Sequence, residues 1–214
     1  MRKSEIIILG IIILSFVIGI YYYPQMPEKL ASHWNEKGQV NGYMSKFWGL
    51  FFMPIISVGM LLLFILIPRL DPLNSNIAQF RKYYDGFVVT IMVFLFYLYL
   101  LTIFWNTGYT FNMIIFLAPA LAILYYSCGI LIENAKRNWF IGIRTPWTMS
   151  SDNVWDKTHK IGGKLFKIAG VFAFMSIFFQ KYAIFIIVFP VMIVSIYTVV
   201  YSYFEYQKEK QSTL

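Results

Sequence analysis

The sequence predicts an all-α fold, in which a polytopic membrane protein crosses the bilayer with six transmembrane helices and carries an amphipathic cytoplasmic helix between spans four and five. Three observations support this fold class. Of the 214 residues, 59% are hydrophobic and only 13% are charged, which is about half the charged share of a typical soluble domain. Apolar runs long enough to cross a bilayer also recur along the chain. Most of the surface is therefore expected to face lipid.

Six apolar segments are interpreted as spans: residues 6–23, 47–68, 87–105, 111–132, 165–179 and 182–204. The first ends in YYYPQMP rather than in a small-residue cleavage site, so we interpret it as a retained helix and not as a signal peptide. A single helix over the last two would be about 60 Å long, whereas the hydrocarbon core is about 30 Å thick. The chain is therefore expected to turn back near Gln180 and Lys181.

These spans divide the chain into two units. Residues 1–68 form an N-terminal two-span unit with an extracellular loop at 24–46, and residues 69–214 form a four-span unit with cytoplasmic loops at 69–86 and 133–164. The single cysteine of the sequence, Cys128, lies inside an apolar segment, so an intramolecular disulfide is excluded.

The positions of the basic residues predict the orientation. With the N-terminus inside, 14 of the 18 lysines and arginines fall on the cytoplasmic side, and four fall outside, at Lys29, Lys37, Lys46 and Lys181. This asymmetry follows the positive-inside rule. We therefore expect a multi-pass protein of the cell (plasma) membrane with both termini cytoplasmic. The net charge of +8 then belongs to the inner face, where membrane lipids are its partners and direct binding of nucleic acid is not expected.

The extracellular loop at 24–46 combines aromatic, polar and turn-forming residues. Asn41 and Gly42 form a dipeptide that favours a turn. The candidate residues for contact with an external ligand are His33, Trp34, Asn35, Gly38 and Tyr43. A structural alternative is an aromatic and polar rim that rests on the lipid headgroups. The two histidines of the chain fall on opposite sides of the membrane, so no metal site is predicted.

The first cytoplasmic loop, 69–86, is expected to contain a helix boundary. Asp71 and Pro72 end the preceding span, and Asn74, Ser75 or Asn76 caps the next helix. We expect that helix to begin in the cytoplasm and to continue into the third span.

The second cytoplasmic loop contains the segment NWFIGIRTPWTMSSDNVWDKTHKIGGKLF, residues 138–166. Pro146 favours an extended conformation at Thr145, so the first part is interpreted as a rigid turn or a short extended loop. One of the two serines in SSDN then supplies an N-cap. The helix that follows is expected to bend at Gly162 and Gly163 before it enters the fifth span.

Lysines recur along one face of this helix. Lys157, Lys160, Lys164 and Lys167 follow one another at steps of three, four and three residues, beside a stripe of apolar residues. The helix is therefore amphipathic and suited to the inner leaflet. Lys157, Lys160 and Lys164 form a basic face, which either docks a cytoplasmic partner or contacts lipid headgroups alone. Lys167 is expected to extend its ammonium group to the interface.

Asp156, His159 and the serines at 150 and 151 raise the question of a catalytic triad. The sequence contains no nucleophile-elbow, phosphate-cradling or H-E-x-x-H pattern. A separation of one helical turn between Asp156 and His159 arises readily by chance. We therefore predict no catalytic residues, no cofactor and no enzyme activity.

Segment 138–166 resembles the signature of the SdpI family, bacterial membrane proteins named for immunity to a secreted killing peptide. The outer segment LASHWNEKGQVNGYMSK is similar to a small domain of unknown function that begins many of these proteins, and DPLNSNIAQFRKYYDGF fits the first inner connection of the family. The residues of the signature are Asn138, Phe140, Gly142, Arg144, Thr145, Pro146, Trp147, Trp155, His159, Gly162 and Gly163.

The resemblance implies a six-span protein that protects its own cell from an extracellular peptide toxin. The named member of the family also holds a small transcriptional repressor at the membrane, which implies a cytoplasmic repressor protein as a second partner. Two alternatives stay open. One is a transporter-like or lipid-handling protein, although the spans carry no buried ionisable pair apart from end residues such as Glu5, Glu133 and Lys167. The other is a membrane-embedded hydrolase.

Overall fold

The computed structural model describes residues 2–212 and confirms the six predicted spans. Six helices in this range are long and apolar enough to cross a membrane: α1 (Lys3–Tyr22), α2 (Lys46–Leu70), α4 (Arg81–Asn106), α5 (Met113–Asn134), α7 (Asp152–Met175) and α8 (Ala183–Ser212). The remaining elements are the short helices α3 (Asn74–Gln79) and α6 (Pro146–Ser150), the strands β1 (Lys29–Trp34) and β2 (Val40–Ser45), and 3-10 turns at Tyr23–Gln25, Ser176–Phe178 and Gln180–Tyr182. The last two turns connect α7 to α8, so the chain turns back at Gln180 and Lys181 as predicted.

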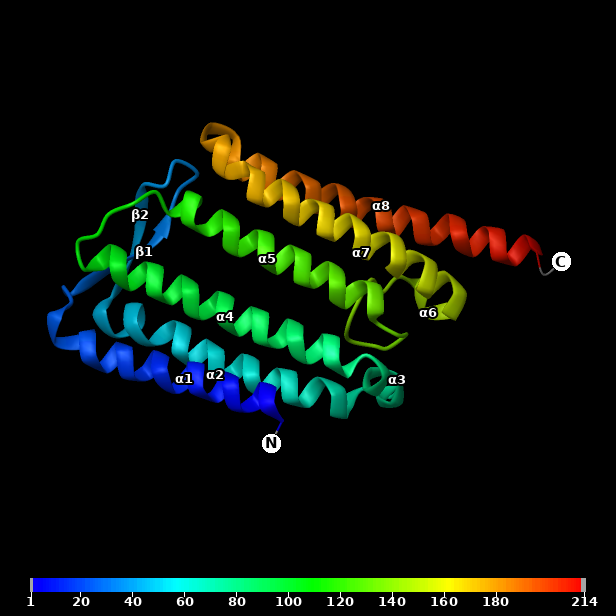
Figure 1. Cartoon of the computed structure of the whole chain (residues 1–214), viewed down its shortest axis with the longest axis horizontal. Helices are drawn as coiled ribbons and strands as arrows, with labels where there is room; N and C mark the ends of the chain where they lie inside the picture. The colour runs from blue at the N-terminus through cyan, green and yellow to red at the C-terminus, as the bar shows by residue number, and fades with distance from the viewer. Residues whose placement is uncertain (1, 213–214) are drawn as a thin grey trace.

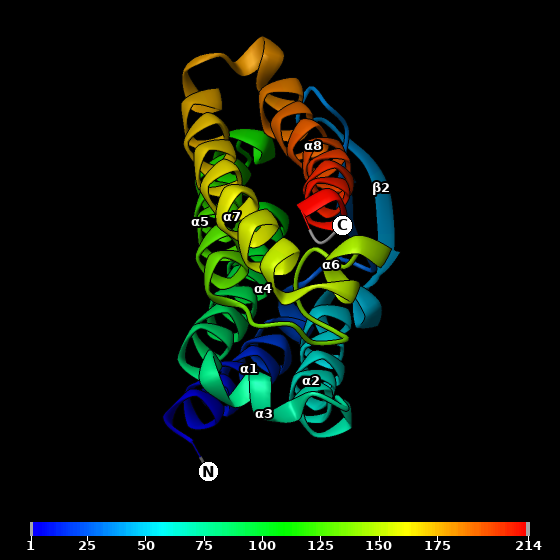
Figure 2. The ribbon, with the colours of Figure 1, turned by 90° about the vertical axis from the view of Figure 1, so that its right-hand side faces the viewer.

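The long helices run side by side (Figure 1). The β1–β2 hairpin and the α7–α8 turn lie at one end of the bundle, which we call the hairpin end. Both termini, α3 and α6 lie at the other, which we call the terminal end. Helix α4 is central, because it packs against α1, α2 and α5, whereas α8 packs against α7 and α5. Viewed from the terminal end, α8 lies away from α1 and α2 (Figure 2). That the terminal end faces the cytoplasm stays a prediction from the charges.

Apolar side chains cover the outside of the helices. Ile20, Leu62 and Ile193 are each more than half exposed, as expected for helices whose solvent is lipid. The largest buried cluster includes Phe80, Met92 and Trp155, which come from the α3–α4 junction, α4 and α7. This cluster lies towards the terminal end and holds the connections there against the spans.

The boundary before the third span differs from the prediction. Asp71 ends α2 as expected, since its N–H bonds to the Ile67 carbonyl. The side chain of Asp71, rather than Asn74, Ser75 or Asn76, then orders the next turn by accepting a bond from Leu73 N at 2.7 Å. The helix also does not run on into the span, because Phe80 leaves the helical conformation between α3 and α4. Its buried side chain gives this break a packing reason.

Helix α7 is not interrupted at Gly162 and Gly163, so the amphipathic helix and the fifth span are one continuous helix. The glycines instead permit close packing. A Cβ at Gly163 would lie 2.7 Å from the Gly129 carbonyl oxygen and 2.6 Å from Glu133 Cβ on α5. Small residues allow two membrane helices to approach in this way. The structure therefore gives the pair a role in contact between helices.

The connection at 24–46 contains an antiparallel hairpin that the sequence analysis did not anticipate. Its turn is not at Asn41 and Gly42, which lie inside β2. Asn35 makes the turn instead, because its side chain accepts bonds from Lys37 N and Gln39 N at 3.0 and 2.9 Å. Gly42 of the predicted turn dipeptide instead allows the two strands to pack closely, since a Cβ there would lie 2.9 Å from His33 Cβ across the hairpin.

Candidate functional site

The loop that connects α5 to α6 is folded around the side chain of Asn138, which is fully buried. Its oxygen accepts bonds from Phe140 N and Ile141 N at 2.9 and 2.6 Å. Its amide nitrogen donates to Lys136 O and Ile141 O at 2.8 and 2.9 Å. One side chain therefore uses both donors and its acceptor to fix residues 136–141. We call residues 135–145 the signature loop.

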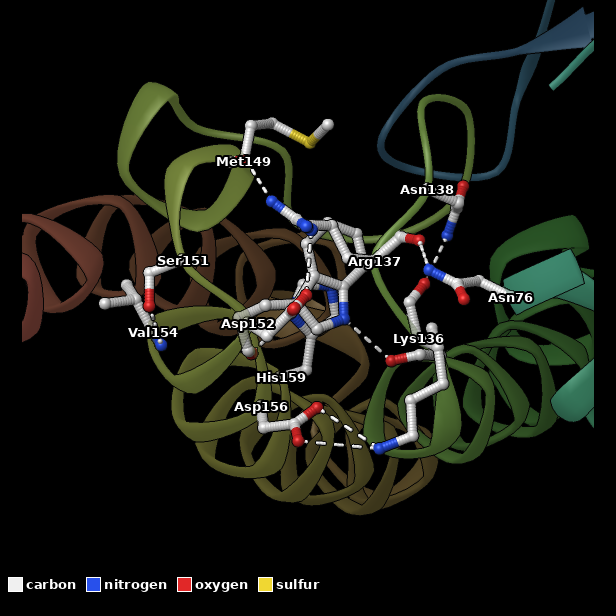
Figure 3. A network of polar contacts seen from close by, with 12 residues as sticks. Asn76, Lys136, Arg137, Asn138, Met149, Ser151, Asp152, Val154, Asp156 and His159 are labelled. Carbon is white, nitrogen blue, oxygen red and sulfur yellow. Dashed lines mark hydrogen bonds and ion pairs between the residues drawn. The ribbon is translucent and has the colours of Figure 1, made fainter. Parts of the chain in front are cut away.

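Two residues of the first connection at the terminal end tie this loop to α2 and α3. Asp71, already bonded to Leu73, uses its other oxygen to accept a bond from Trp139 N at 2.8 Å. Asn76 donates its amide to Arg137 O at 2.8 Å, as Figure 3 shows. Asp71 is almost completely buried, so these bonds are shielded from water. The two loops of the terminal end therefore form one structural unit.

His159 of α7 bonds to the second half of the signature loop. Its Nε2 accepts a bond from Ile143 N at 2.9 Å, and its Nδ1 lies 2.9 Å from the Trp155 carbonyl. These partners assign a neutral ring with the proton on Nδ1. Gly142 has a φ of +113°, and a side chain there would collide with His159 Nε2. Both ring nitrogens therefore serve the backbone, and His159 holds the loop in place.

A threonine pair fixes the end of the signature loop. Thr145 Oγ1 accepts from Thr148 N at 3.1 Å, and Thr148 Oγ1 accepts from Thr145 N at 2.9 Å, which is a reciprocal cap of the kind known at helix starts. Pro146 occupies the first turn of α6, and Thr145 is extended as predicted. Thr145 Oγ1 also lies 3.0 Å from Ser202 Oγ of α8. The loop is thereby connected to the last span.

The two serines of SSDN have structural partners. Ser151 is the N-cap of α7, as predicted for one of the pair, since it accepts from Val154 N at 3.2 Å. It also donates to both carboxylate oxygens of Glu209 at 2.8 and 2.9 Å. Ser150 donates to the Pro146 carbonyl at 2.7 Å. With His159 bonded to backbone at both nitrogens, a triad of these residues is not assembled.

Ion pairs surround the signature loop, and Figure 3 shows two of them. Arg137 Nε lies 2.8 Å from Asp152, and Lys136 Nζ lies 3.4 Å from Asp156. Arg137 also donates to the Met149 carbonyl at 2.9 Å. The pairs connect the loop to the first turns of α7. Within residues 2–212, no three His, Cys, Asp or Glu side chains gather as metal ligands would.

The predicted basic face is partly engaged inside the protein. Lys157 Nζ lies 3.0 Å from Glu205 of α8, whose second oxygen pairs with Lys208 at 2.9 Å. Lys157, Lys160 and Lys164 nevertheless line one shallow groove of about 190 Å³ beside Tyr201. The structure therefore brings the three predicted lysines together.

Lys167, which was expected to extend to the interface, has a partner on a neighbouring helix. It forms an ion pair with Glu133 of α5, and both side chains are largely shielded from the surroundings. The two residues that the sequence analysis treated as separate span ends are thus partners. A charge pair between α5 and α7 adds to the close packing of their glycines.

A cavity beneath the signature loop was not anticipated. It has a volume of about 480 Å³ and lies between α2, α4, α5, α7 and α8, with residues 140–145 of the loop along one side. Most of its lining is apolar, and Arg144 is the one lysine or arginine among the lining residues. No sequence pattern marks such a space, because it depends on how α8 is set against the other helices.

At the hairpin end, the predicted ligand-facing residues adopt different roles. Asn35 makes the turn, Gly38 has a φ of +74° within it, and Trp34 packs edge-on against Trp105 at 5.8 Å. His33 is exposed and bonds to Asn41. Tyr43 is 63% exposed. His33 and Tyr43 are therefore the two that present their side chains outwards.

The hairpin is fastened to the third span by a side-chain amide. Asn106, the last residue of α4, accepts from Ala31 N at 2.8 Å and donates to Ala31 O at 3.0 Å. Ala31 is paired with Tyr43, and since its N–H and C=O both bond to Asn106, the two form a non-hydrogen-bonded pair of the ladder, in which both residues direct their backbone groups away from the partner strand. The inner edge of the hairpin is therefore occupied by Asn106, and Tyr43 turns its backbone groups to the outer edge.

Comparison with known proteins gives three matches. The SdpI/YfhL protein family matches residues 134–202, which contain the signature loop, α6, α7 and part of α8. A domain of unknown function, DUF1648, matches residues 10–58, which contain the hairpin. The chain is also similar to the immunity protein SdpI of Bacillus subtilis (strain 168), with 25% identity over 207 residues that cover 96% of this chain and 97% of that protein. No solved structure matches the chain.

Proposed function

We infer from the family match and from the similarity over nearly the whole chain that this protein is a member of the SdpI family, and on that premise we propose that it protects its own cell from an extracellular peptide toxin. The observation that carries the proposal is the similarity over nearly the full length of both chains to a protein named for immunity. The matched segments include both the hairpin and the signature loop. The proposed protection is by binding, since the residues that suggested a catalytic triad are bonded elsewhere.

We propose that the outer surface of the hairpin contacts the toxin. Tyr43 offers an exposed aromatic side chain and outward backbone groups, and His33 lies beside it across the bulge. Aromatic residues of this kind often carry much of the energy of a protein interface. The anchor at Asn106 and the fully buried Leu30 hold the hairpin in a fixed position. A preformed surface loses less entropy on binding than a mobile loop.

The proposed relay to a cytoplasmic repressor would use the opposite end. Helix α4 runs from Asn106 at the hairpin to the α3–α4 junction. The connection that precedes this junction bonds to the signature loop through Asp71 and Asn76. We propose that a displacement of α4 would reach the signature loop through this preceding connection. The groove of Lys157, Lys160 and Lys164 is the surface we propose for an acidic face of the repressor.

A survival assay tests the toxin surface. The protein is expressed in a toxin-sensitive host with the cognate peptide, and Tyr43→Ala is expected to raise the toxin sensitivity about tenfold, because an interface anchor contributes roughly 1–2 kcal/mol. Tyr109→Ala is the matched control, since Tyr109 is also exposed but lies in the connection between α4 and α5, outside the hairpin. Equal protection by wild type and Tyr43→Ala at equal protein levels would remove the hairpin surface from the proposal. Absence of protection by the wild type would contradict immunity itself.

A lipid-handling role is the second candidate function, and the cavity favours it. Its lining is mostly apolar and comes from five of the six spans. The cavity offers a place for a lipid within the protein.

A further inference from the structure

The cavity beneath the signature loop contains one polar group that the fold does not use fully. Tyr84 donates its hydroxyl to the Phe64 carbonyl at 2.8 Å. Thr198 and Ser195 donate to carbonyls of their own helix at 3.0 and 2.8 Å. These lining hydroxyls are therefore satisfied and behave as part of an apolar wall. Arg144 is different, because a guanidinium group has five N–H donors.

Arg144 has no carboxylate partner among residues 2–212, unlike its neighbours in space and sequence. Lys136 and Arg137 pair with Asp156 and Asp152, and Lys157 pairs with Glu205. Arg144 donates to the Trp139 carbonyl, which leaves most of its donors and its full charge for a ligand. A guanidinium group binds phosphate through two parallel hydrogen bonds.

The loop fixes the backbone on both sides of Arg144. Ile143 N is bonded to His159, and Thr145 is bonded to Thr148 and Ser202. Gly142 takes a conformation that a side chain would not tolerate there. The backbone position of Arg144 is thus set by the bonds of its two neighbours, Ile143 and Thr145. Such preorganisation favours binding of a ligand at this position.

We propose that this cavity binds one anionic phospholipid, with its phosphate on Arg144 and an acyl chain between α8 and the helices α2 and α4. The volume of about 480 Å³ lies within the range of about 300–1,000 Å³ for ligand sites. Phe140 and Val199 both line the cavity and are 43% and 44% exposed, so a lipid has a lateral way in. An apolar chain with an anionic head matches both parts of the lining.

Native mass spectrometry of the purified full-length protein in detergent tests the proposal. The probes are phosphatidylglycerol and phosphatidylcholine with identical acyl chains, titrated separately. We expect one phosphatidylglycerol to be retained about tenfold more strongly than phosphatidylcholine, because both lipids carry the phosphate but the choline cation of phosphatidylcholine offsets its charge beside Arg144. Soluble glycerol phosphate should not displace it, because it lacks the chains.

Three variants distinguish binding of the lipid headgroup from binding of its acyl chain. Arg144→Gln should lower phosphatidylglycerol retention about tenfold, to the level of phosphatidylcholine. Val199→Trp fills the cavity and should abolish retention of both lipids, while circular dichroism reports an unchanged helix content. Arg69→Gln is the control, because Arg69 is exposed at the terminal end and lies outside the cavity. It should behave as wild type.

Several results would overturn the inference. Equal losses in Arg69→Gln and Arg144→Gln would indicate a general attraction of the basic end for anionic lipid. Unchanged retention in Val199→Trp would exclude the cavity. Displacement by glycerol phosphate would identify a site for free phosphate instead. The measurement requires no toxin, so its outcome is independent of the proposed immunity.

Discussion

The ring of His159 lies flat against the indole of Trp155, with 3.8 Å between the ring centroids and 15° between the planes. Trp155 is itself fixed, because its Nε1 donates to the Ala135 carbonyl at 2.7 Å. The two side chains thus connect the start of the signature loop, at Ala135, to its second half, at Ile143. They lie one helical turn apart on α7, so a rigid helix sets the distance between two parts of a loop.

Removing this support should destabilise the protein without removing a catalytic group. His159→Ala leaves Ile143 N–H without its acceptor and deletes the ring stack, so we expect a loss of about 1–3 kcal/mol in the free energy of unfolding. Thermal unfolding in detergent measures it. Ser150→Ala is the control, since Ser150 is exposed, and it should stay within about 0.5 kcal/mol of wild type. An equal unfolding midpoint for His159→Ala would contradict a structural role.

The close approach of α5 and α7 predicts an asymmetric response to small substitutions. Gly163→Ala places a methyl group 2.6 Å from Glu133 Cβ, so the helices must separate, at about 1–3 kcal/mol for overpacking. Gly59→Ala adds the same methyl group on α2, where nothing lies within 4 Å. Thermal unfolding should therefore separate the two variants. A Gly163→Ala protein as stable as Gly59→Ala would show that α5 and α7 can separate at Gly163 without a measurable loss of stability.

The orientation follows from the charges and can be tested by labelling. With Cys128 replaced by serine, a cysteine at position 153 should not react with an impermeant reagent added outside intact cells, because it lies at the terminal end. A cysteine at position 37, in the hairpin turn, should react. The charge split between the two sides motivates both expectations. Labelling at position 153 together with protection at position 37 would contradict the predicted orientation and indicate the opposite one.

The lysine groove distinguishes lipid contact from docking of a repressor. Lys160 and Lys164 are the better pair to change, because Lys157 also holds Glu205. Replacing both by Gln removes roughly 2 kcal/mol of attraction to an anionic surface, at about 1 kcal/mol for each lysine. Six spans keep the protein in the membrane, so its abundance should not change.

If the groove docks an acidic repressor, a reporter of that repressor should lose its response in this double variant, while survival against the toxin is retained. The single variant Lys157→Gln serves as the comparison, because it breaks the pair with Glu205 and leaves the other two lysines in place. A response equal to wild type in the double variant would leave lipid contact as the role of the groove.

The spans are predictable from sequence because each is a long apolar run, and the signature loop is marked by its dense polar residues. The roles within the loop are not. Asn138 bonds to four backbone groups, and its donors and acceptor become useful only once the chain has wrapped around it. The partner of Lys167 is 34 residues away on another helix. Local spacing places this lysine on a face but cannot supply the carboxylate.

The hairpin and the cavity escape prediction for different physical reasons. Asn41 and Gly42 favour a turn locally, but the side-chain bonds of Asn35 place the turn earlier, and pairing with β1 draws the dipeptide into a strand. The cavity depends on the distance between α8 and the pair α2 and α4, which lie far apart in sequence. Its lining residues look like ordinary apolar positions of five separate spans.

The ion pair between Lys167 and Glu133 also bears on how the protein is made. Helix α7 is the least apolar of the six spans, and an unpaired charge adds to the cost of inserting a span, by less near its end than the about 2.5–3.5 kcal/mol at the bilayer centre. Glu133 is synthesised first, so α5 carries the countercharge that α7 needs. We expect Glu133→Leu to lower the fraction of α7 that inserts, as glycosylation sites in the α7–α8 turn would report, and unchanged glycosylation would contradict this. During biogenesis, α5 would then have to stay beside the translocon until α7 is synthesised, so that the two helices enter the lipid as a pair.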